Sequence, residues 1–524
     1  MTKRFGRKDA FSSLIEPAFF YIIISFFLFY LSRPYLHNVK SEFVISIAVI
    51  GIWRYSLMII NYLRAAMYAH YTYPKYQKRI DELPWVKRYP EHIYFIIPSY
   101  KEEAWVSTEV FQSLLTDINT LPCKGTLIVS TGSDYDDSII QNVYDAHPNK
   151  DNIALIFQRQ ENGKRIAMGH ALRALARDVN QKDEQSLTVF MDGDTYIPCG
   201  TLEKSLPIFM IEKDLGAVTT NEVAYINSES RWYKDWFNLK FAQRHVLFQS
   251  QSISKRVLTL TGRFSIFRTS AVISEDFIGM IENDIIIDPS YGKFRFLMGD
   301  DKSSWYNLLK NSWEMLYLPD VLVYSLESRD GDFLKVSQSL PYRWYGNTLR
   351  NNARARALKN QPLFIRYLLW DQVILMWTSV VGITTALFFA FFVNIFYLPL
   401  YISWILIVRT LQMTIFTLFG HRVSVRTLPL MLYTQWIGSY IKIKAFFHLS
   451  DQKWSKSKDE VQTADKDIDI IRYSLSSYFS PYRMYLYIVL FFFLMLTVYT
   501  QILSLPQIKI FLNFNTPVSK DRAK

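Results

Sequence analysis

The sequence predicts an α/β domain with a doubly wound, mostly parallel sheet, embedded in a helical protein that crosses a membrane several times. Two observations lead to this fold class. The overall hydrophobic fraction, 50% of 524 residues, is ordinary, but its distribution is not. Very apolar stretches flank a central region of ordinary soluble composition. Within the central region, short apolar strands alternate with helical segments, and each strand ends in polar or Gly-rich residues.

The N-terminal region, residues 1–65, predicts two membrane spans at about 14–32 and 43–63. Arg54 interrupts the second span, so we expect its face to meet protein or a polar lumen rather than lipid. Basic residues precede the first span, and by the positive-inside rule two spans then return the chain to the cytosol. The first span lacks a clear cleavage site, which favours a retained helix over a removed signal peptide.

The central region, residues 66–340, predicts the α/β domain. Its expected strands are, in chain order, His92–Pro98, Gly125–Ser130, Ile153–Gln158, Leu187–Met191 and Ala217–Thr220. Ligands of doubly wound sheets bind beyond the carboxyl ends of the strands. Asp134, Lys164 and Asp192 each follow a different strand, and we therefore expect all three at one edge of the sheet.

The C-terminal part begins with a basic stretch, residues 341–372, that predicts interfacial amphipathic helices. Residues 373–524 predict a membrane region, with spans at about 373–396, 400–420 and 483–503. The segment 428–447 is apolar but contains Lys442 and Lys444. It could be a further span or a helix lying in the membrane interface.

The net charge of +12 would raise nucleic acid as a partner of a soluble protein. Here much of the excess flanks the predicted spans, and no recognisable nucleic-acid-binding module is present, so we expect no nucleic-acid partner. The two cysteines, Cys123 and Cys199, suggest no disulfide framework and fit a reducing cytosol.

Asp192 and Asp194 directly follow a buried apolar strand, one residue apart. Carboxylate oxygens suit Mg²⁺ or Mn²⁺, and such an ion held by one or two carboxylates keeps positions open for substrate phosphates. The pair therefore predicts a phosphorylated or nucleotide-activated ligand. Taken alone, it could also be a solvated acid pair in a loop.

Four further motifs carry candidate chemistry. Asp134 could accept hydrogen bonds from a nucleobase or ribose, or simply belong to a Gly- and Ser-rich turn. Gly163–Arg165 puts two cations at the start of a helix, which could bind an anion or be a solvated cap. Asp300–Asp301 could supply a general base, with one aspartate capping the next helix. Arg343–Trp344 offers a guanidinium for a diphosphate and an aromatic face for a sugar, or a snorkelling arginine on an interfacial helix.

The order of these motifs resembles the processive family 2 glycosyltransferases, which include cellulose, chitin and hyaluronan synthases. The resemblance covers residues 91–345 and implies a cytosolic GT-A glycosyltransferase domain wrapped by membrane spans. One departure is Leu340, which stands where the family usually has Gln; Gln338 lies two residues earlier. The matching residues are the opening 97–103, Asp134, Lys164, Asp192, Asp194, Thr261–Arg263, Gly299–Asp301 and Arg343–Trp344.

On the donor side, the resemblance implies a role for each matching residue. Asp134 would contact the base of the nucleotide, and Lys164 its phosphates. Asp192 and Asp194 would hold the diphosphate and a metal ion, Mg²⁺ or Mn²⁺. Arg343 would bind the diphosphate.

On the acceptor side, Asp301, beside Asp300, would deprotonate the acceptor hydroxyl. Trp344 would bind the sugar at the acceptor site, and the loop with Arg263 would border the acceptor. The segment near 451–458, with Trp454, resembles the gating loop that closes over the bound nucleotide in these synthases. Because that loop must be cytosolic, we favour the interfacial alternative for the helix before it.

Within the family, the strings 260–268, 299–306 and 343–352 are most similar to the bacterial alginate (mannuronan) synthases. This resemblance implies a GDP-mannuronate donor, a growing β-1,4-linked polyuronate and a multi-pass protein of the bacterial inner (cytoplasmic) membrane. Arg263 and Arg268 become candidates to meet a uronate carboxylate, or else form structural ion pairs. The resemblance also implies a membrane-anchored regulatory subunit that binds cyclic-di-GMP. Two alternatives remain open: a polysaccharide synthase that uses a UDP-sugar, and a non-processive membrane glycosyltransferase.

Overall fold

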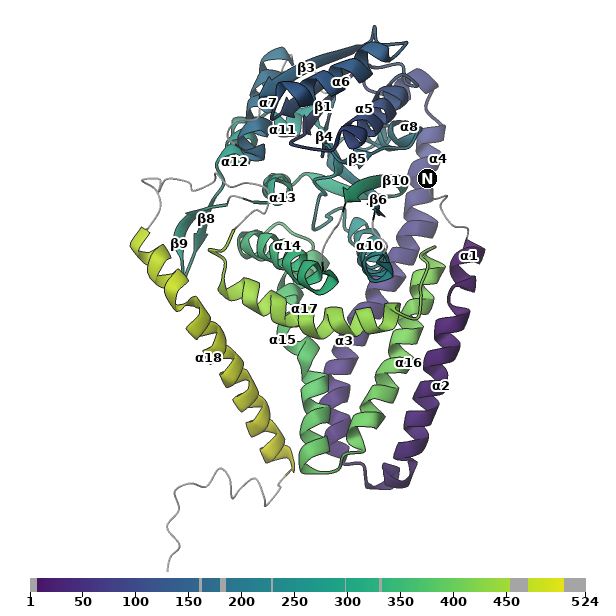
Figure 1. The fold of residues 1–524 in the computed structure, drawn as a ribbon, viewed down its shortest axis with the longest axis vertical. Coiled ribbons are helices and arrows are strands. Elements are labelled where there is room, and N and C mark those ends of the chain that lie inside the picture. The colour runs from purple at the N-terminus through teal and green to yellow at the C-terminus, as the bar shows by residue number, and fades with distance from the viewer. Residues whose placement is uncertain are drawn as a thin grey trace, which may run out of the picture.

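The structure is a computed structural model that describes residues 7–159, 163–179, 185–227, 230–296, 298–328, 332–452 and 470–503. An α/β domain lies at one end of a group of long helices (Figure 1). Two more helices, α14 (Phe333–Arg356) and α17 (Thr427–Phe447), lie between the α/β domain and the long helices and run across them.

An eight-stranded sheet forms the centre of the α/β domain, with neighbours in the order β3-β2-β1-β4-β7-β6-β10-β5. β7 is antiparallel to β4 and β6, β5 is antiparallel to β10, and the other neighbours are parallel. The predicted mostly parallel sheet is therefore confirmed. The strands are β1 (His92–Pro98), β2 (Lys124–Thr131), β3 (Ile153–Arg159), β4 (Leu187–Met191), β5 (Thr195–Tyr196), β6 (Leu215–Asn227), β7 (Phe264–Arg268) and β10 (Glu314–Ser328).

The two faces of the sheet bury separate apolar clusters, because successive side chains of a strand point to opposite faces. From β1, Phe95 packs with Val110 and Leu114 of α5 (Ala104–Ile118). Its neighbour Ile96 packs in the other cluster with Leu172 of α7 (Lys164–Asp178). Both faces are thus covered, as expected for a doubly wound fold. The remaining elements of this domain are α6 (Asp134–Ala146), α8 (Thr201–Ser205), α9 (Ile208–Ile211), α10 (Arg231–Ser252), α11 (Thr269–Val272), α12 (Glu275–Glu282), α13 (Asp300–Lys310) and the hairpin β8 (Ile285–Asp288) and β9 (Gly292–Arg295).

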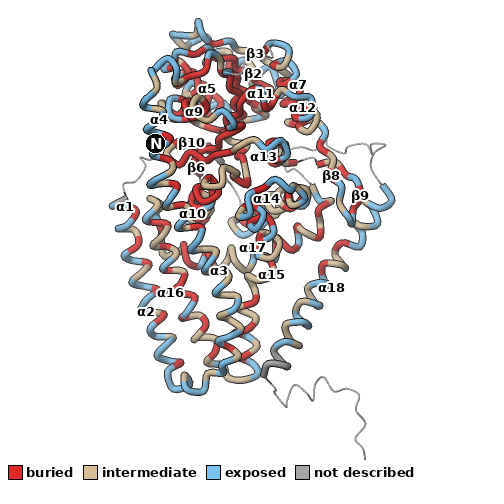
Figure 2. Tube along the Cα trace, turned by 180° about the vertical axis from the view of Figure 1, so that it is seen from behind, coloured by how far each residue is buried: buried red, intermediate tan, exposed pale blue. Residues whose placement is uncertain are grey.

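Within the described residues, five helical stretches are long and apolar enough to cross a membrane, judged by length and composition. Figure 2 shows buried residues concentrated in the sheet, whereas the helices at the other end of the molecule are mostly exposed or half-buried, as expected of surfaces that contact lipid. α17 is not among these stretches. They are Lys8–Asn38, which contains α1 (Arg7–Ser12) in part and α2 (Ile15–Ser32), Ser41–Asp81, which contains α3 (Ser41–Met67) and α4 (Tyr73–Asp81), α15 (Leu363–Phe392), α16 (Tyr397–Leu418) and residues Ile470–Val498 of α18 (Ile470–Leu503).

The three predicted domain boundaries fall inside helices rather than between them. Residue 65 lies within α3, residue 340 within α14 and residue 372 within α15. Each of these helices carries a change of composition without a break in the backbone, because several apolar and polar residue types have similar helix propensities. The boundaries predicted from composition therefore do not coincide with helix ends, and the division into domains stays a prediction.

Candidate active site

Three charged residues from three different elements meet at the carboxyl edge of the sheet. The Nζ atom of Lys164 lies 2.8 Å from Asp192 Oδ1 and 3.0 Å from Asp300 Oδ2. Lys164 is the first residue of α7, Asp192 follows β4, and Asp300 is the first residue of α13. Burial lowers the pKa of Lys164, but the two carboxylates outweigh it and hold that pKa above its ordinary value. Lys164 in turn lowers the pKa of Asp300 against the effect of burial.

Gly262 lies against this cluster. A Cβ atom added there would lie 3.7 Å from Asp192 Oδ2, 3.8 Å from Lys164 Nζ and 3.9 Å from Asp301 Cβ, which is ordinary contact distance. Asp301 is thereby placed beside the cluster. Burial, and then the charge of Asp300, raise the pKa of Asp301 to about 6. A carboxylate of this kind can accept a proton near neutral pH and suits a general base.

The helix that carries Asp300 and Asp301 begins at a glycine with a left-handed backbone. Gly299 has φ +86°, and a Cβ there would lie 3.0 Å from Nδ2 of Asn347 in α14. Arg343 lies one helical turn before Asn347 and so projects from the same face of α14. The structure thus places Arg343 on the side of α14 that faces the start of α13.

The other predicted donor residues lie along the same sheet edge. Ser99, just after β1, approaches Gly193 so closely that a Cβ on this glycine would lie 2.7 Å from the serine Oγ. The backbone carbonyl of Asp194 accepts a hydrogen bond of 2.9 Å from Leu326. Asp134 is the first residue of α6; its side chain is 98% exposed and forms an ion pair with Arg159. Asp134 is therefore accessible from solvent, but no described contact joins it to the Lys164 cluster.

Asp192 and Asp194 are the residues that could hold a divalent cation. The side chain of Asp192 is 32% exposed and lies beside Gly262. The described residues contain no group of three or more His, Cys, Asp or Glu side chains that could enclose a metal ion. Two carboxylates with an otherwise open shell suit Mg²⁺ or Mn²⁺ completed by phosphate oxygens and water, and do not suit a closed structural site.

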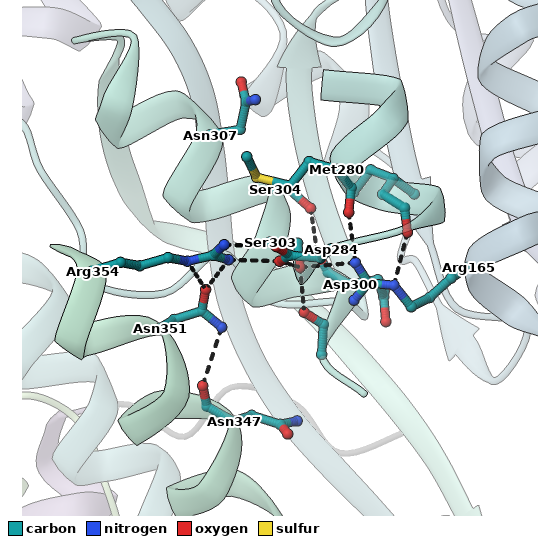
Figure 3. Close-up of polar contacts among 12 residues, drawn as sticks. Arg165, Met280, Asp284, Asp300, Ser303, Ser304, Asn307, Asn347, Asn351 and Arg354 are labelled. Carbon is teal, nitrogen blue, oxygen red and sulfur yellow. Dashed lines mark hydrogen bonds and ion pairs between the residues drawn. The ribbon is translucent and has the colours of Figure 1, made fainter. Parts of the chain in front are cut away.

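A buried polar network connects α13 to α12, to α14 and to Asp284, the residue before β8 (Figure 3). Both guanidinium Nη atoms of Arg354 donate to the carboxylate of Asp284 at 2.6 Å, and Ser303 donates to the same carboxylate at 2.5 Å. Arg165 donates to Ser303 at 3.0 Å and to the carbonyl of Ile281 at 2.8 Å. The expectation that Arg165 joins Lys164 in binding an anion is therefore wrong, because its guanidinium is buried against α12 and α13.

On the acceptor side, Arg263 is tied to a buried acid. Its Nη1 lies 3.2 Å from Glu222 Oε2, which also pairs with Arg244 at 2.6 Å. Arg268 lies at the opposite edge of the sheet, because β7 is antiparallel to β4 and Arg268 pairs in register with Leu187. It donates to three backbone carbonyls there, so Arg268 has a structural role through hydrogen bonds and lies away from the Lys164 cluster.

Trp344 packs face to face with Trp236 of α10, with ring centroids 6.0 Å apart and an interplanar angle of 10°. It therefore borders the apolar cluster between α10 and the long helices rather than the Lys164 cluster. Leu340 belongs to this same cluster, whereas Gln338 is exposed. Positions two apart on a helix point in nearly opposite directions, so Gln338 does not replace the missing glutamine.

The start of the predicted gating segment is fixed against the catalytic domain. Arg350 of α14 donates to the carbonyls of Leu449 at 2.8 Å and Asp451 at 2.7 Å. Tyr342 donates to the carboxylate of Asp451 at 3.2 Å, and Gln452 donates to the carbonyl of Arg295 at 2.7 Å. Trp454 lies outside the described residues.

A cavity of about 650 Å³ lies among α3, α10, α15, α16 and α17. Its upper lining includes Leu258 and Thr259, which accept hydrogen bonds from the ammonium group of Lys302, the residue after Asp301. Its far lining includes Gly382 and Tyr401. Arg54 also lines it and pairs with Asp371 at 2.6 Å, so this arginine meets a polar group of the protein, as expected.

Comparison with known proteins defines first the class and then the family. Residues 90–347 match the family described as "Glycosyltransferase like family 2". Over 426 residues, the chain is 33% identical to "Glycosyltransferase alg8" of Pseudomonas syringae pv. tomato (strain ATCC BAA-871 / DC3000), covering 80% of this chain and 85% of that protein. Over 421 residues it is 32% identical to the protein of the same name from Azotobacter vinelandii, with the same coverage. The chain therefore belongs to the Alg8 family of family 2 glycosyltransferases.

Two solved structures are similar at lower identity. The mannosyltransferase PcManGT from Pyrobaculum calidifontis, in complex with GDP-Man and Mn²⁺, has a TM-score of 0.44 and 17% identity, covering 73% of this chain and 97% of that one. S. aureus TarS 1–349 in complex with UDP-GlcNAc has a TM-score of 0.35 and 16% identity, covering 68% of this chain and 90% of that one.

Proposed function

We propose that this membrane glycosyltransferase is processive: it polymerises a nucleotide-activated sugar, and the product leaves through the cavity between the long helices. The single observation that supports this most is the position of Asp301. It lies beside Lys164 and Asp192, and its neighbour Lys302 donates to Leu258 and Thr259, which line the cavity. The path that we propose for the polymer begins at the base and enters the cavity past these two residues.

The donor we propose is GDP-mannuronate, and the product is mannuronan, the polymer from which alginate is made. Membership of the Alg8 family favours this donor over a UDP-sugar. Lys164 and Arg343 would bind the diphosphate as cations, and Asp134 would contact the nucleoside from the edge of the sheet. Asp192 and Asp194 would hold Mg²⁺ or Mn²⁺, which supplies positive charge to the leaving diphosphate when it is bound.

The transfer we propose inverts the anomeric centre in one displacement. Asp301 takes the proton from the terminal hydroxyl of the polymer, and that oxygen attacks the anomeric carbon of the donor. The bond from this carbon to the diphosphate breaks, and the nucleoside diphosphate leaves with the electron pair. Lys164 stabilises the charge that develops on the leaving group. Asp300 pairs with the ammonium group of Lys164 and holds it in place.

We further propose that the protein lies in the bacterial inner membrane with its α/β domain in the cytosol, where nucleotide sugars are made. α17 would lie in the membrane interface on that side, because the residues after it contact α14 and β9. Trp454 would close over the nucleotide from this side. A membrane-anchored subunit that binds cyclic-di-GMP would regulate the enzyme.

The test is nucleoside-diphosphate release by membranes that contain this chain together with the regulatory subunit. GDP-mannuronate, UDP-glucose, UDP-N-acetylglucosamine and UDP-glucuronate are compared with Mg²⁺ or Mn²⁺, and the products are sized. Of the four donors, we expect only GDP-mannuronate to give long polymer. Polymer from a UDP-sugar would overturn the donor assignment, and single-sugar products would show a non-processive enzyme.

A matched variant tests the catalytic base. Asp301→Asn is nearly isosteric and should lower transfer by about 10²–10⁴-fold while donor binding stays within about threefold. Near-normal polymer yield from this variant would refute the assignment.

A further inference from the structure

The charged side chains that line the cavity are mostly basic. Its lining contains five basic side chains and, among the described residues, only one acidic side chain, Asp371. Three of the five are hydrogen-bonded or ion-paired within the protein. Arg54 pairs with Asp371, Arg244 pairs with Glu222, and Arg409 donates to two glutamine side chains.

The other two basic side chains, Lys240 and Lys442, have no such partner in the part of the chain that the structure describes. Lys240 lies on α10, with its Nζ 5.8 Å from the centroid of the Trp236 ring. Lys442 lies on α17, is 8% exposed, and has its Nζ 5.6 Å from the centroid of the Tyr345 ring. Aromatic faces compensate a buried ammonium group only in part.

Both ammonium groups keep their charge at neutral pH. Loss of hydration lowers the pKa of each to about 8, and Asp371 partly opposes this effect at Lys442. A protein rarely keeps two charged amines in a cavity without counter-charges unless a ligand supplies them. The ligand's groups would have to be anionic, because an ammonium group only donates hydrogen bonds.

We propose that Lys240 and Lys442 bind carboxylates of an anionic polysaccharide in the cavity. This inference rests on the proposed function, since it takes the cavity as the path of the product. It adds that the path itself selects a polymer of acidic sugars, independently of the donor pocket around Lys164. A neutral polymer would leave both ammonium groups unpaired. Their loss of hydration would then remain uncompensated at each step of the polymer through the cavity.

The test measures binding to the purified full-length protein in lipid nanodiscs. The probes are a fluorescent hexamer of β-1,4-linked mannuronate and a neutral hexamer, cellohexaose, with the same label. We expect the wild type to prefer the acidic hexamer. Lys240→Met and Lys442→Met should each weaken its binding about tenfold, the value of one charge-assisted hydrogen bond, while cellohexaose binding changes less than about threefold.

Matched controls separate charge from structure. Lys240→Arg and Lys442→Arg should keep the preference for the acidic hexamer. Lys234→Met on α10 and Lys444→Met on α17 alter exposed lysines of the same helices that do not line the cavity, and should leave both affinities unchanged. Binding of GDP by every variant shows that the α/β domain remains folded.

Three results would overturn the proposal. The first is equal affinity of the wild type for the two hexamers, and the second is no loss of acidic-hexamer binding in either Lys→Met variant. The third is an anionic phospholipid that native mass spectrometry finds retained by the wild type and lost from both variants. Failure of the proposed function is a different result, namely no nucleoside-diphosphate release with any donor, and the hexamer assay does not depend on turnover.

Discussion

The protonation of one carboxyl group, Asp301, should set the pH dependence of the enzyme. Its pKa is raised to about 6 by burial and by Asp300. A general base acts only when deprotonated, so transfer should be constant above about pH 7 and fall about tenfold per pH unit below pH 6. A pH–rate profile with saturating donor measures this. An acidic limb near pH 4, the ordinary range of a carboxyl group, would contradict it.

The same raised pKa has a consequence for stability. Because the pKa of Asp301 is higher in the folded chain than its ordinary value of 3.8, the charged carboxylate destabilises the folded state at pH 7. This cost disappears as the pH falls through about 6 toward 4. Asp301→Asn should therefore raise the free energy of unfolding at pH 7 by up to about a few kcal/mol, and the melting temperature should rise with it. At pH 4 both should be nearly unchanged. Equal melting temperatures of wild type and variant at pH 7 would contradict the raised pKa.

At the residue scale, the sequence singled out Lys164, Asp192 and Asp301, which lie together in the structure. Each follows a strand end or begins a helix, and such positions converge at one edge of the sheet. Their roles in the transfer stay predictions. It did not identify Asp284 or Arg354, whose importance depends on a long-range contact between α14 and the segment before β8. No local pattern marks a single buried acid that meets a distant arginine.

The secondary-structure elements around the site depend on that same contact. The side chain of Asp284 is 2% exposed, and Arg354 neutralises it from α14. Arg354→Met leaves an unpaired buried carboxylate, which typically costs about 3–5 kcal/mol. We expect a clearly lower melting temperature and reduced transfer, because Ser303 of α13 bonds to the same carboxylate. Thermal unfolding monitored through a fluorescent ligand of the α/β domain measures the loss.

An exposed ion pair of the same domain provides the control for this variant. Arg173 of α7 pairs with Glu282 of α12 at 2.5 Å, and the arginine side chain is about half exposed. Arg173→Met should therefore lower the melting temperature much less than Arg354→Met does. Equal losses from the two variants would show that the buried contact has no special role in holding α13.

The elements themselves were predicted unevenly, for a physical reason. β1 and β4 have the predicted bounds, because a fully buried strand reads as a continuous apolar run between polar residues. β7 and β10 were not predicted. β7 is short and ends in Arg268, and β10 is interrupted by Pro319 and Asp320, where its register with β6 shifts. Their place in the sheet is decided by pairing with distant strands, which periodicity does not reveal.

For the whole molecule, the cavity makes a prediction about coupling between synthesis and export. Enzyme reconstituted in sealed vesicles, with the α/β domain outside and donor added outside, should accumulate polymer in the lumen. Addition of a polymer-degrading lyase outside tests this, because luminal product is protected until detergent is added. Complete degradation without detergent would show that the product does not cross the membrane.

A side chain that narrows the cavity should uncouple donor binding from elongation. Gly382 of α15 faces the hydroxyl of Tyr401 so closely that a Cβ would overlap it, and both residues line the cavity. Gly382→Leu must push the tyrosine ring aside, and interiors do not absorb such volume without displacement. We expect donor binding within about threefold of the wild type and product at least about tenfold shorter. Gly279→Leu, at a helical glycine with no atom within 4 Å of an added Cβ, is the control and should give product of normal length. Normal polymer from Gly382→Leu would mean that the growing chain takes another path, and the cavity would then have no bearing on export.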